Sequence, residues 1–134
     1  RFADDIQRLI TDAEGRTQGN TKLHLTIALS YGGRQEILDA ARSLAEQVQR
    51  GEIAPADIDE TRFERALYTA GLPEPDLSIR TSGEQRISNF LLWQMAYAEF
   101  VFTDVLWPDF GQEQMADALA EFRGRERRFG GAAV

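Results

Sequence analysis

The sequence predicts an α/β domain with a mainly parallel sheet flanked by helices. Two observations lead to this prediction. Segments that alternate apolar and other residues, as strands do, are separated by segments with the apolar spacing of helices, and glycine or proline stands between them. The chain has 134 residues, of which 43% are hydrophobic and 28% charged. These values are ordinary for one globular domain, and we expect a single domain over residues 1–134.

The first half of the chain predicts a helix, a strand and a second helix. Apolar residues at helical spacing occupy residues 2–13. The alternation of Leu23, Leu25, Ile27 and Leu29 with other residues predicts a strand, and the apolar run over residues 27–29 suggests burial on both faces. After a glycine turn at residues 32–33, the spacing predicts an amphipathic helix over residues 37–48, which Gly51 ends.

The second half predicts further alternation of helices and strands. Asp59 and Ser88 have the side chains of helix N-caps. The expected helices cover residues 59–70, 89–100 and 115–122, and the expected strands cover residues 77–81 and 101–106. Because three strands are few for an open parallel sheet, we expect part of the sheet to lie upstream of Arg1, in a longer protein.

Composition argues against several classes of function. The formal net charge is −7, and the only dense basic run is RGRERR at residues 123–128, so we expect no nucleic-acid partner. The chain has no cysteine, which excludes a disulfide framework and thiolate chemistry. The longest apolar runs are far shorter than the roughly 18 residues typical of a membrane-spanning helix.

Polar residues follow the strand predicted at residues 77–81. Arg80 lies at the carboxyl end of this strand, Arg86 in the next loop and Ser88 at the start of the next predicted helix. In an open α/β sheet, ligands bind at the carboxyl ends of strands. Guanidinium groups and the N–H groups of a helix N-terminus bind phosphate there, so the pattern predicts an anion site.

Glu99 is the second feature with chemical meaning. It lies in the helix predicted over residues 89–100, which is apolar on nearly every side and therefore expected to be buried. A buried carboxylate is costly unless it pairs with or binds a cation. Beside a diphosphate, Mg²⁺ is the expected cation.

The residue pattern alone leaves simpler interpretations open. These are a structural ion pair of Arg80 with Asp76 or Glu84, a solvated loop position for Arg86, a helix cap for Ser88, and a solvent-facing or arginine-paired position for Glu99.

Residues 76–110 resemble the C-terminal signature of the cis-prenyltransferases, most closely that of the bacterial undecaprenyl diphosphate synthases. The segment reads DLSIRTSGEQRISNFLLWQMAYAEFVFTDVLWPDF. Residues 31–34, YGGR, are similar to the family's Y-G-G-R turn. Arg128 and Gly130 are similar to its R-x-G element. The likeness covers the chain from about Asn20 to Gly131.

The resemblance implies roles for individual residues. It implies that Arg80, Arg86 and Ser88 bind the diphosphate of isopentenyl diphosphate and that Glu99 helps to hold Mg²⁺. It further implies that Arg128 and Gly130 reach across a homodimer toward the partner's diphosphate site.

The implied activity is the condensation of isopentenyl diphosphate with an allylic diphosphate, farnesyl diphosphate, in cis configuration. The implied product is undecaprenyl diphosphate, the lipid carrier for cell-wall polysaccharide synthesis. The expected location is the cytoplasm, at the inner face of the membrane, with peripheral membrane contact for product release.

One departure from the family is large. The family's catalytic aspartate lies in an N-terminal motif of the form M-D-G-N-G-R-W-A, which these residues lack. No catalytic residue is assigned, and we expect the 134 residues alone to be inactive. The D-D-x-x-D motif of trans-prenyltransferases is also missing. The competing hypotheses are a non-catalytic partner subunit, a prenyl-diphosphate-binding module and an unrelated phosphate-binding α/β domain.

Overall fold

The computed structural model describes residues 3–125 and divides the chain into two compact units, residues 1–30 and 31–134. The first unit contains helix α1 (Asp4–Thr17), which was predicted from its apolar spacing. Its first turn carries Asp4 and Asp5 and its last turn carries Arg16, so the charges complement the helix dipole. Gly15 lies within the helix.

The strand predicted over residues 23–29 is not formed, and this prediction was wrong. The side chains of Leu23, Leu25, Ile27 and Leu29 are each at least half exposed. A strand exists only through hydrogen bonds to a neighbouring strand. Within residues 3–125, the only strands that pair are two later ones, so this apolar segment has no ladder to join.

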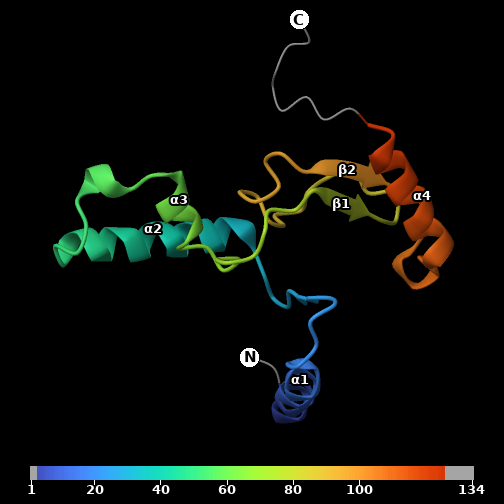
Figure 1. The fold of residues 1–134 in the computed structure, drawn as a ribbon, viewed down its shortest axis with the longest axis horizontal. Helices are drawn as coiled ribbons and strands as arrows, with labels where there is room; N and C mark the ends of the chain where they lie inside the picture. Colours follow the sequence, from blue (N-terminus) through green and yellow to red (C-terminus); the bar gives the residue numbers. More distant parts are fainter. Residues whose placement is uncertain (1–2, 126–134) are drawn as a thin grey trace, which may run out of the picture. The chain divides into compact units, whose positions relative to one another are not determined.

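The second unit begins with helix α2 (Gly33–Gln49), against which the short helix α3 (Glu60–Glu64) packs (Figure 1). A 3₁₀ turn at Pro55–Asp57 connects them. Asp59 caps α3 as predicted, because its carboxylate accepts a hydrogen bond of 2.8 Å from the Arg62 backbone N–H. The helix ends at Glu64, however, well before the residue 70 that the sequence pattern predicts.

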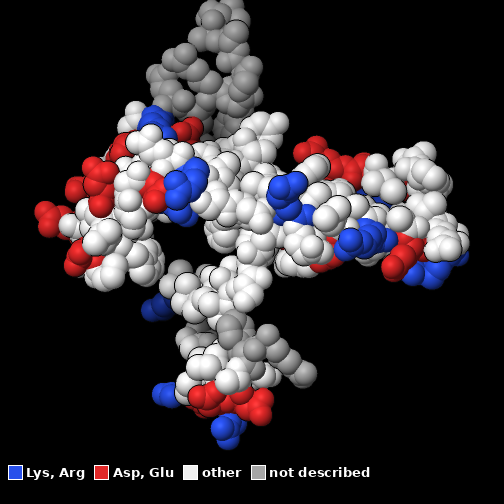
Figure 2. Space-filling model, turned by 180° about the vertical axis from the view of Figure 1, so that it is seen from behind, with Lys and Arg blue, Asp and Glu red and all other residues white. Residues whose placement is uncertain are grey.

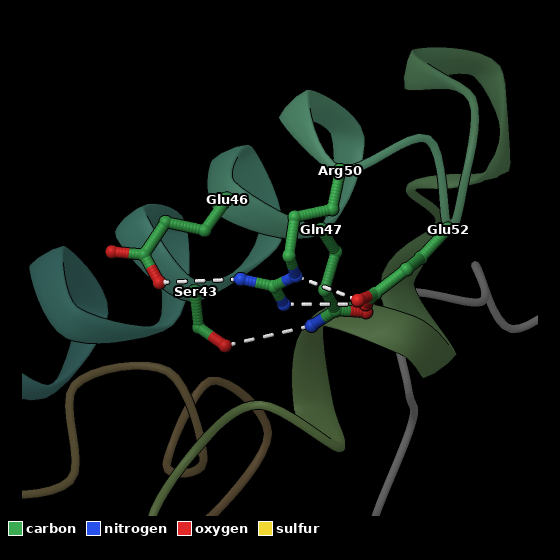
Figure 3. Close-up of polar contacts among 5 residues, drawn as sticks. All are labelled: Ser43, Glu46, Gln47, Arg50 and Glu52. Atoms are coloured by element: carbon green, nitrogen blue, oxygen red, sulfur yellow. Dashed lines mark hydrogen bonds and ion pairs between the residues drawn. The ribbon is translucent and has the colours of Figure 1, made fainter.

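The carboxyl end of α2 is closed by a small polar cluster (Figure 3). The Arg50 guanidinium lies 2.6 Å from one carboxylate oxygen of Glu52 and 3.8 Å from Glu46, while Gln47 bonds Ser43 one turn earlier. The chain reverses at Gly51, where φ is +72°, a value that glycine adopts without strain. The hydrogen bond from Arg50 lowers the pKa of Glu52, and the same bond raises the pKa of Arg50.

Strands β1 (Leu77–Arg80) and β2 (Glu99–Phe102) form a two-stranded parallel sheet (Figure 1). Leu77 lies opposite Glu99, and Arg80 lies opposite Phe102. The final helix α4 (Gln112–Arg123) follows a 3₁₀ turn at Trp107–Asp109 and packs on β2. The sheet and the final helix agree with the predicted α/β class, although β2 covers residues 99–102 and the predicted strand covers residues 101–106.

The helix predicted over residues 89–100 is a second wrong prediction. Residues 88–97 form a series of turns, with positive φ at Ser88, Asn89 and Leu91. Left-handed backbone interrupts a right-handed helix and costs roughly 1–2 kcal/mol per residue outside glycine. Tertiary contacts of Asn89 with α2 and of Trp93 with Phe63, whose rings are 4.5 Å apart, outweigh local helix propensity here.

On the face drawn in Figure 2, the described acidic and basic side chains are interspersed, without an extended basic surface. In the described part of the chain, no helix combines the length and the apolar character that a bilayer span requires.

Candidate diphosphate-binding site

Arg80 is placed by the last residue of β1 and by the turn that follows it. The Arg80 carbonyl accepts a hydrogen bond of 2.9 Å from the Thr103 N–H, which continues the ladder beyond the strand. The next N–H groups, of Ser82 and Gly83, donate to the carbonyls of Val105 and Thr103. Both residues have positive φ, so the chain turns sharply away from the strand end and leaves Arg80 at its edge.

A cavity of about 290 Å³ lies at this edge and brings two predicted site residues together. Arg80 and Arg86 both line it. The rest of its wall is mainly apolar and consists of Ser78, Ile79, Ile87, Phe90, Met95, Phe100 and Phe102. Two guanidinium groups at an apolar wall suit an anion that carries a hydrocarbon tail, because the charged head binds arginine and the tail leaves water.

The two arginines differ in their present partners. Arg86 is paired with Glu84, and its side chain is 66% exposed. Within residues 3–125, the guanidinium of half-buried Arg80 has no ion pair or side-chain hydrogen bond, so the alternative pair with Glu84 is not formed. Arg80 can therefore bind an anion without first giving up an internal partner.

Ser88 is exposed and does not line the cavity. The expectation that it caps a helix is wrong, because turns follow it. The free N–H groups of a helix N-terminus are consequently not available there. Its place in the loop between Arg86 and Phe90 nevertheless keeps it next to cavity-lining residues along the chain.

Glu99 is not on a helix but is the first residue of β2. In the register of the sheet, Glu99 lies opposite Leu77 and Phe102 lies opposite Arg80. Glu99 is therefore three residues, roughly 10 Å along the strand, away from the residue opposite Arg80. Its carboxylate accepts a hydrogen bond of 2.8 Å from Arg125, which also binds Glu121 on α4. These bonds raise the pKa of Arg125, the bond with Glu99 most. The arginine-paired alternative thus describes Glu99 in this structure.

The donor set fits Mg²⁺ only in part. Residues 3–125 contain no group of three or more His, Cys, Asp or Glu side chains that could hold a metal ion. Mg²⁺ keeps several waters and is often held by one or two carboxylates together with substrate phosphates. Glu99 can supply one such carboxylate, and its side chain is 29% exposed. Arg128 and Gly130, the other predicted site residues, lie outside the described residues.

Sequence reasoning missed two residues that shape this region. Glu36 is 1% exposed although it is charged, and it shares one stripe of α2 with buried Ala40 and Leu44. That spacing of four residues was a usable signal. Asn89 accepts hydrogen bonds from the first two N–H groups of α2, those of Gly33 at 2.7 Å and Arg34 at 2.8 Å. No local sequence pattern predicts that Asn89, 55 residues beyond Arg34, caps this helix.

Comparison with known proteins agrees with this geometry. The family model described as "Putative undecaprenyl diphosphate synthase" matches residues 1–130. The chain belongs to this prenyltransferase family. The resemblance to cis-prenyltransferases drawn from residues 76–110 is thereby confirmed.

Relatives and solved structures give the same assignment to the prenyltransferase family. The chain is 57% identical over 133 residues to an isoprenyl transferase of Caulobacter vibrioides, covering 99% of this chain and 51% of the relative. It is 53% identical to a ditrans,polycis-undecaprenyl-diphosphate synthase of Haemophilus ducreyi that is farnesyl-diphosphate specific, covering 98% of this chain and 54% of that one.

A crystal structure of lavandulyl diphosphate synthase from Lavandula x intermedia, in complex with dimethylallyl diphosphate, matches with a TM-score of 0.91. Its identity is 48%, and the match covers 97% of this chain and 56% of that structure. The prenyltransferase fold is thus confirmed. The chain spans about half the length of the curated relatives that it matches.

Proposed function

We propose that this chain works within a cis-prenyltransferase that condenses isopentenyl diphosphate with farnesyl diphosphate to make undecaprenyl diphosphate. The observation that carries the proposal is the cavity in which Arg80 and Arg86 meet an apolar wall. Relatives at 52–57% identity include synthases of ditrans,polycis-undecaprenyl diphosphate that are specific for farnesyl diphosphate. This product would serve as the lipid carrier for cell-wall polysaccharides.

In this proposal, the 134 residues supply the site for isopentenyl diphosphate. Arg80 grips the diphosphate with its planar guanidinium, and Arg86 exchanges Glu84 for a phosphate oxygen. Ser88 adds a hydroxyl donor from the same loop. The apolar wall shields the five-carbon tail, since each CH₂ removed from water contributes about 0.8 kcal/mol. The contribution of these residues is positioning and charge stabilisation.

The reaction requires the allylic C–O bond to break, which releases diphosphate. The double bond of isopentenyl diphosphate then attacks the allylic carbon from which the diphosphate departs. A proton is then lost to give the cis double bond. Mg²⁺, when bound, would neutralise charge on the departing diphosphate, and Glu99 is the proposed carboxylate ligand. For Glu99 to act in this way, the hydrogen bond from Arg125 must be shared or released.

The proposed assembly is a homodimer in which Arg128 and Gly130 reach the partner's diphosphate site. We propose that the enzyme works in the cytoplasm and contacts the inner face of the membrane when the product leaves. Residues 1–134 are proposed to form the C-terminal portion of a single catalytic domain.

The test follows labelled isopentenyl diphosphate into butanol-extractable product, with farnesyl diphosphate and Mg²⁺ present, in the complete enzyme that contains this chain. We expect Arg80→Ala to abolish product formation. The matched control is Arg16→Ala, because that side chain is 79% exposed on α1 and pairs only with Asp12 at 3.6 Å among the described residues.

Long-chain product that depends on Arg80 and not on Arg16 would support the proposal, and its length would define the product. A well-folded dimer without product would refute it and favour the non-catalytic partner subunit.

A further inference from the structure

The two substrates of the proposed reaction carry the same diphosphate head. They differ in the tail, which has five carbons in isopentenyl diphosphate and fifteen in farnesyl diphosphate. Arg80 and Arg86 meet only the head in the proposed site, so they do not distinguish the two molecules. A site selects between ligands through the groups in which the ligands differ. The apolar wall of the cavity is therefore where this selection takes place.

One face of the two-stranded sheet forms part of this apolar wall. Arg80 lies opposite Phe102 in the register of the sheet, and Phe100 is two residues before Phe102 on the same strand. Because side chains two residues apart on a strand share a face, Phe100, Phe102 and Arg80 lie on one face of the sheet. The two rings are 6.0 Å apart and nearly parallel, at 13°. A tail that extends from a head bound at Arg80 meets these rings first.

Exposure within the cavity falls from its rim to its floor. Ile87 and Phe90 are each 41% exposed and Phe102 is 42% exposed, so these side chains form the rim. Met95 is 5% exposed, and it is the only buried residue among the described ones that line the cavity. Met95 thus forms the deepest part of the wall.

The backbone of Met95 is fixed by the turns around it. Its N–H donates to the Leu91 carbonyl at 3.0 Å, and its carbonyl accepts a hydrogen bond of 3.2 Å from the Ala98 N–H. Both backbone polar groups are satisfied, so the residue offers the cavity mainly apolar surface. A methionine side chain is unbranched and adapts its shape to a gap, which suits it to close the floor around a small tail.

The volume of the cavity favours a short tail. The cavity of about 290 Å³ is at the lower end of the roughly 300–1,000 Å³ that is typical of small-molecule sites. A diphosphate head takes up part of this space, which leaves room for a short tail above Met95. Further carbons would have to leave through the open mouth, where they stay in water and gain no apolar contact.

We propose that Met95 is the specificity-determining residue of this cavity, because its side chain closes the floor and limits the tail to that of isopentenyl diphosphate. This inference rests on the function proposed above and adds the group that selects the substrate tail. It explains how the cavity rejects a second diphosphate whose head is identical.

The test compares Met95→Ala with Met115→Ala in the complete enzyme. These are the two methionines of this chain, and Met115, which is 42% exposed on α4, does not line the cavity. Calorimetry measures the Kd of two saturated probes that cannot react, 3-methylbutyl diphosphate and the bulkier 3-ethylpentyl diphosphate. An unreactive thio analogue of farnesyl diphosphate is kept at saturation, so that the probes report on the cavity alone.

We expect wild type to bind 3-methylbutyl diphosphate at least tenfold more tightly than 3-ethylpentyl diphosphate, since extra carbons in a closed apolar pocket change affinity roughly 10–200-fold. Met95→Ala is expected to abolish this preference, because a truncated apolar side chain leaves space that an apolar ligand of matching size fills. Met115→Ala is expected to keep the wild-type ratio. A wild type without preference, an unchanged ratio in folded Met95→Ala, or equal changes in both variants would overturn the inference.

Two further variants cover the case in which Met95→Ala fails to fold. Met95→Val removes less volume from the core and is expected to reduce the preference by a smaller factor. Met95→Leu conserves volume, so it is expected to fold and to keep the wild-type ratio. An unchanged ratio in folded Met95→Val would refute the proposal, and so would a preference lost in Met95→Leu.

The readouts also separate this inference from the proposed function. If wild type makes no polyprenyl product but Met95→Ala still loses the preference, the proposed function fails and the size-limiting role of Met95 stands. If wild type makes product and the preference does not depend on Met95, the role of Met95 fails alone. A wild-type enzyme that binds neither probe would overturn both.

Discussion

Asp39 lies on α2 close to the buried Glu36, and its carboxylate accepts hydrogen bonds from the Tyr68 hydroxyl and from Gln35. The bond from Tyr68, followed by that from Gln35, holds the pKa of Asp39 below its ordinary value. A carboxyl group whose pKa is lower in the folded state contributes stability above its unfolded pKa. That contribution is lost as the pH falls through the folded pKa.

We therefore expect Tyr68→Phe to raise the pKa of Asp39 toward the ordinary value for an aspartate and to remove part of this acid-sensitive stability. Titration of the carboxyl carbon by NMR, in wild type and variant, measures the shift directly. An Asp39 pKa that is the same in both proteins would show that the hydroxyl does not stabilise the carboxylate in solution.

The individual site residues differ in how far the sequence could predict them. Arg80 and Arg86 meet at one cavity, as their positions after a strand indicate, because strand ends and the loops after them share one edge of a sheet. Glu99 was assigned to a helix, yet it starts β2. Its ion pair with Arg125 joins residues 26 positions apart, and no local period predicts that pairing.

At the scale of elements, local pattern was sufficient where an element's own residues decide its conformation. Helices α1, α2 and α4 and strand β1 follow from apolar spacing, and the Asp59 cap follows from residue type. Pattern failed at residues 23–29 and 88–98, where partners elsewhere in the chain decide. An alternating segment without a neighbouring strand does not become a strand, and an apolar segment tied to α2 through Asn89 does not become a helix.

The contact between α2 and this loop makes Gly33 a sensitive position. A Cβ atom there would lie 3.0 Å from Leu92 Cγ, 3.1 Å from its backbone N and 3.2 Å from the Asn89 carbonyl oxygen. Since two of these neighbours are backbone, little relaxation is available. We expect Gly33→Ala to lower the free energy of unfolding by about 1–3 kcal/mol, as overpacking typically does, in urea titrations of the complete enzyme.

Gly15→Ala is the matched control for this prediction. Gly15 lies inside α1, and a Cβ atom there would meet nothing within 4 Å. Alanine is the better helix former by about 0.5–1 kcal/mol, so this variant is expected to be no less stable than wild type. Equal stability of wild type and Gly33→Ala would mean that the α2 terminus and the loop are not packed as described.

At the scale of the whole molecule, residues 3–125 combine a cavity lined by Arg80 and Arg86 with a small core. Among the described residues, the buried apolar ones all belong to the unit that begins at Tyr31, and they are Ala40, Leu44, Leu67, Met95, Val101 and Ala118. The alternating residues of segment 23–29 are exposed in the other unit. The chain spans about half the length of its curated relatives. An α/β sheet of two strands leaves apolar surface that a larger sheet would bury.

These observations lead to a prediction for the isolated 134 residues. Condensation needs two diphosphate substrates bound next to each other, and the cavity at Arg80 and Arg86 is the proposed site for one of them. We expect the isolated chain to bind pyrophosphate weakly by calorimetry, through Arg80, but to form no polyprenyl product when farnesyl diphosphate, isopentenyl diphosphate and Mg²⁺ are all present.

The longest natural reading frame that contains the chain, assayed in parallel, is expected to form product. Arg80→Ala in the isolated chain distinguishes specific pyrophosphate binding from weak attraction to other arginines, because only the former depends on that side chain. Labelled long-chain product from the 134 residues alone would contradict the prediction. It would mean that the allylic diphosphate also binds within this chain, and the search for its ligands would then turn to arginines outside the cavity, such as Arg34 and Arg65, which are both exposed.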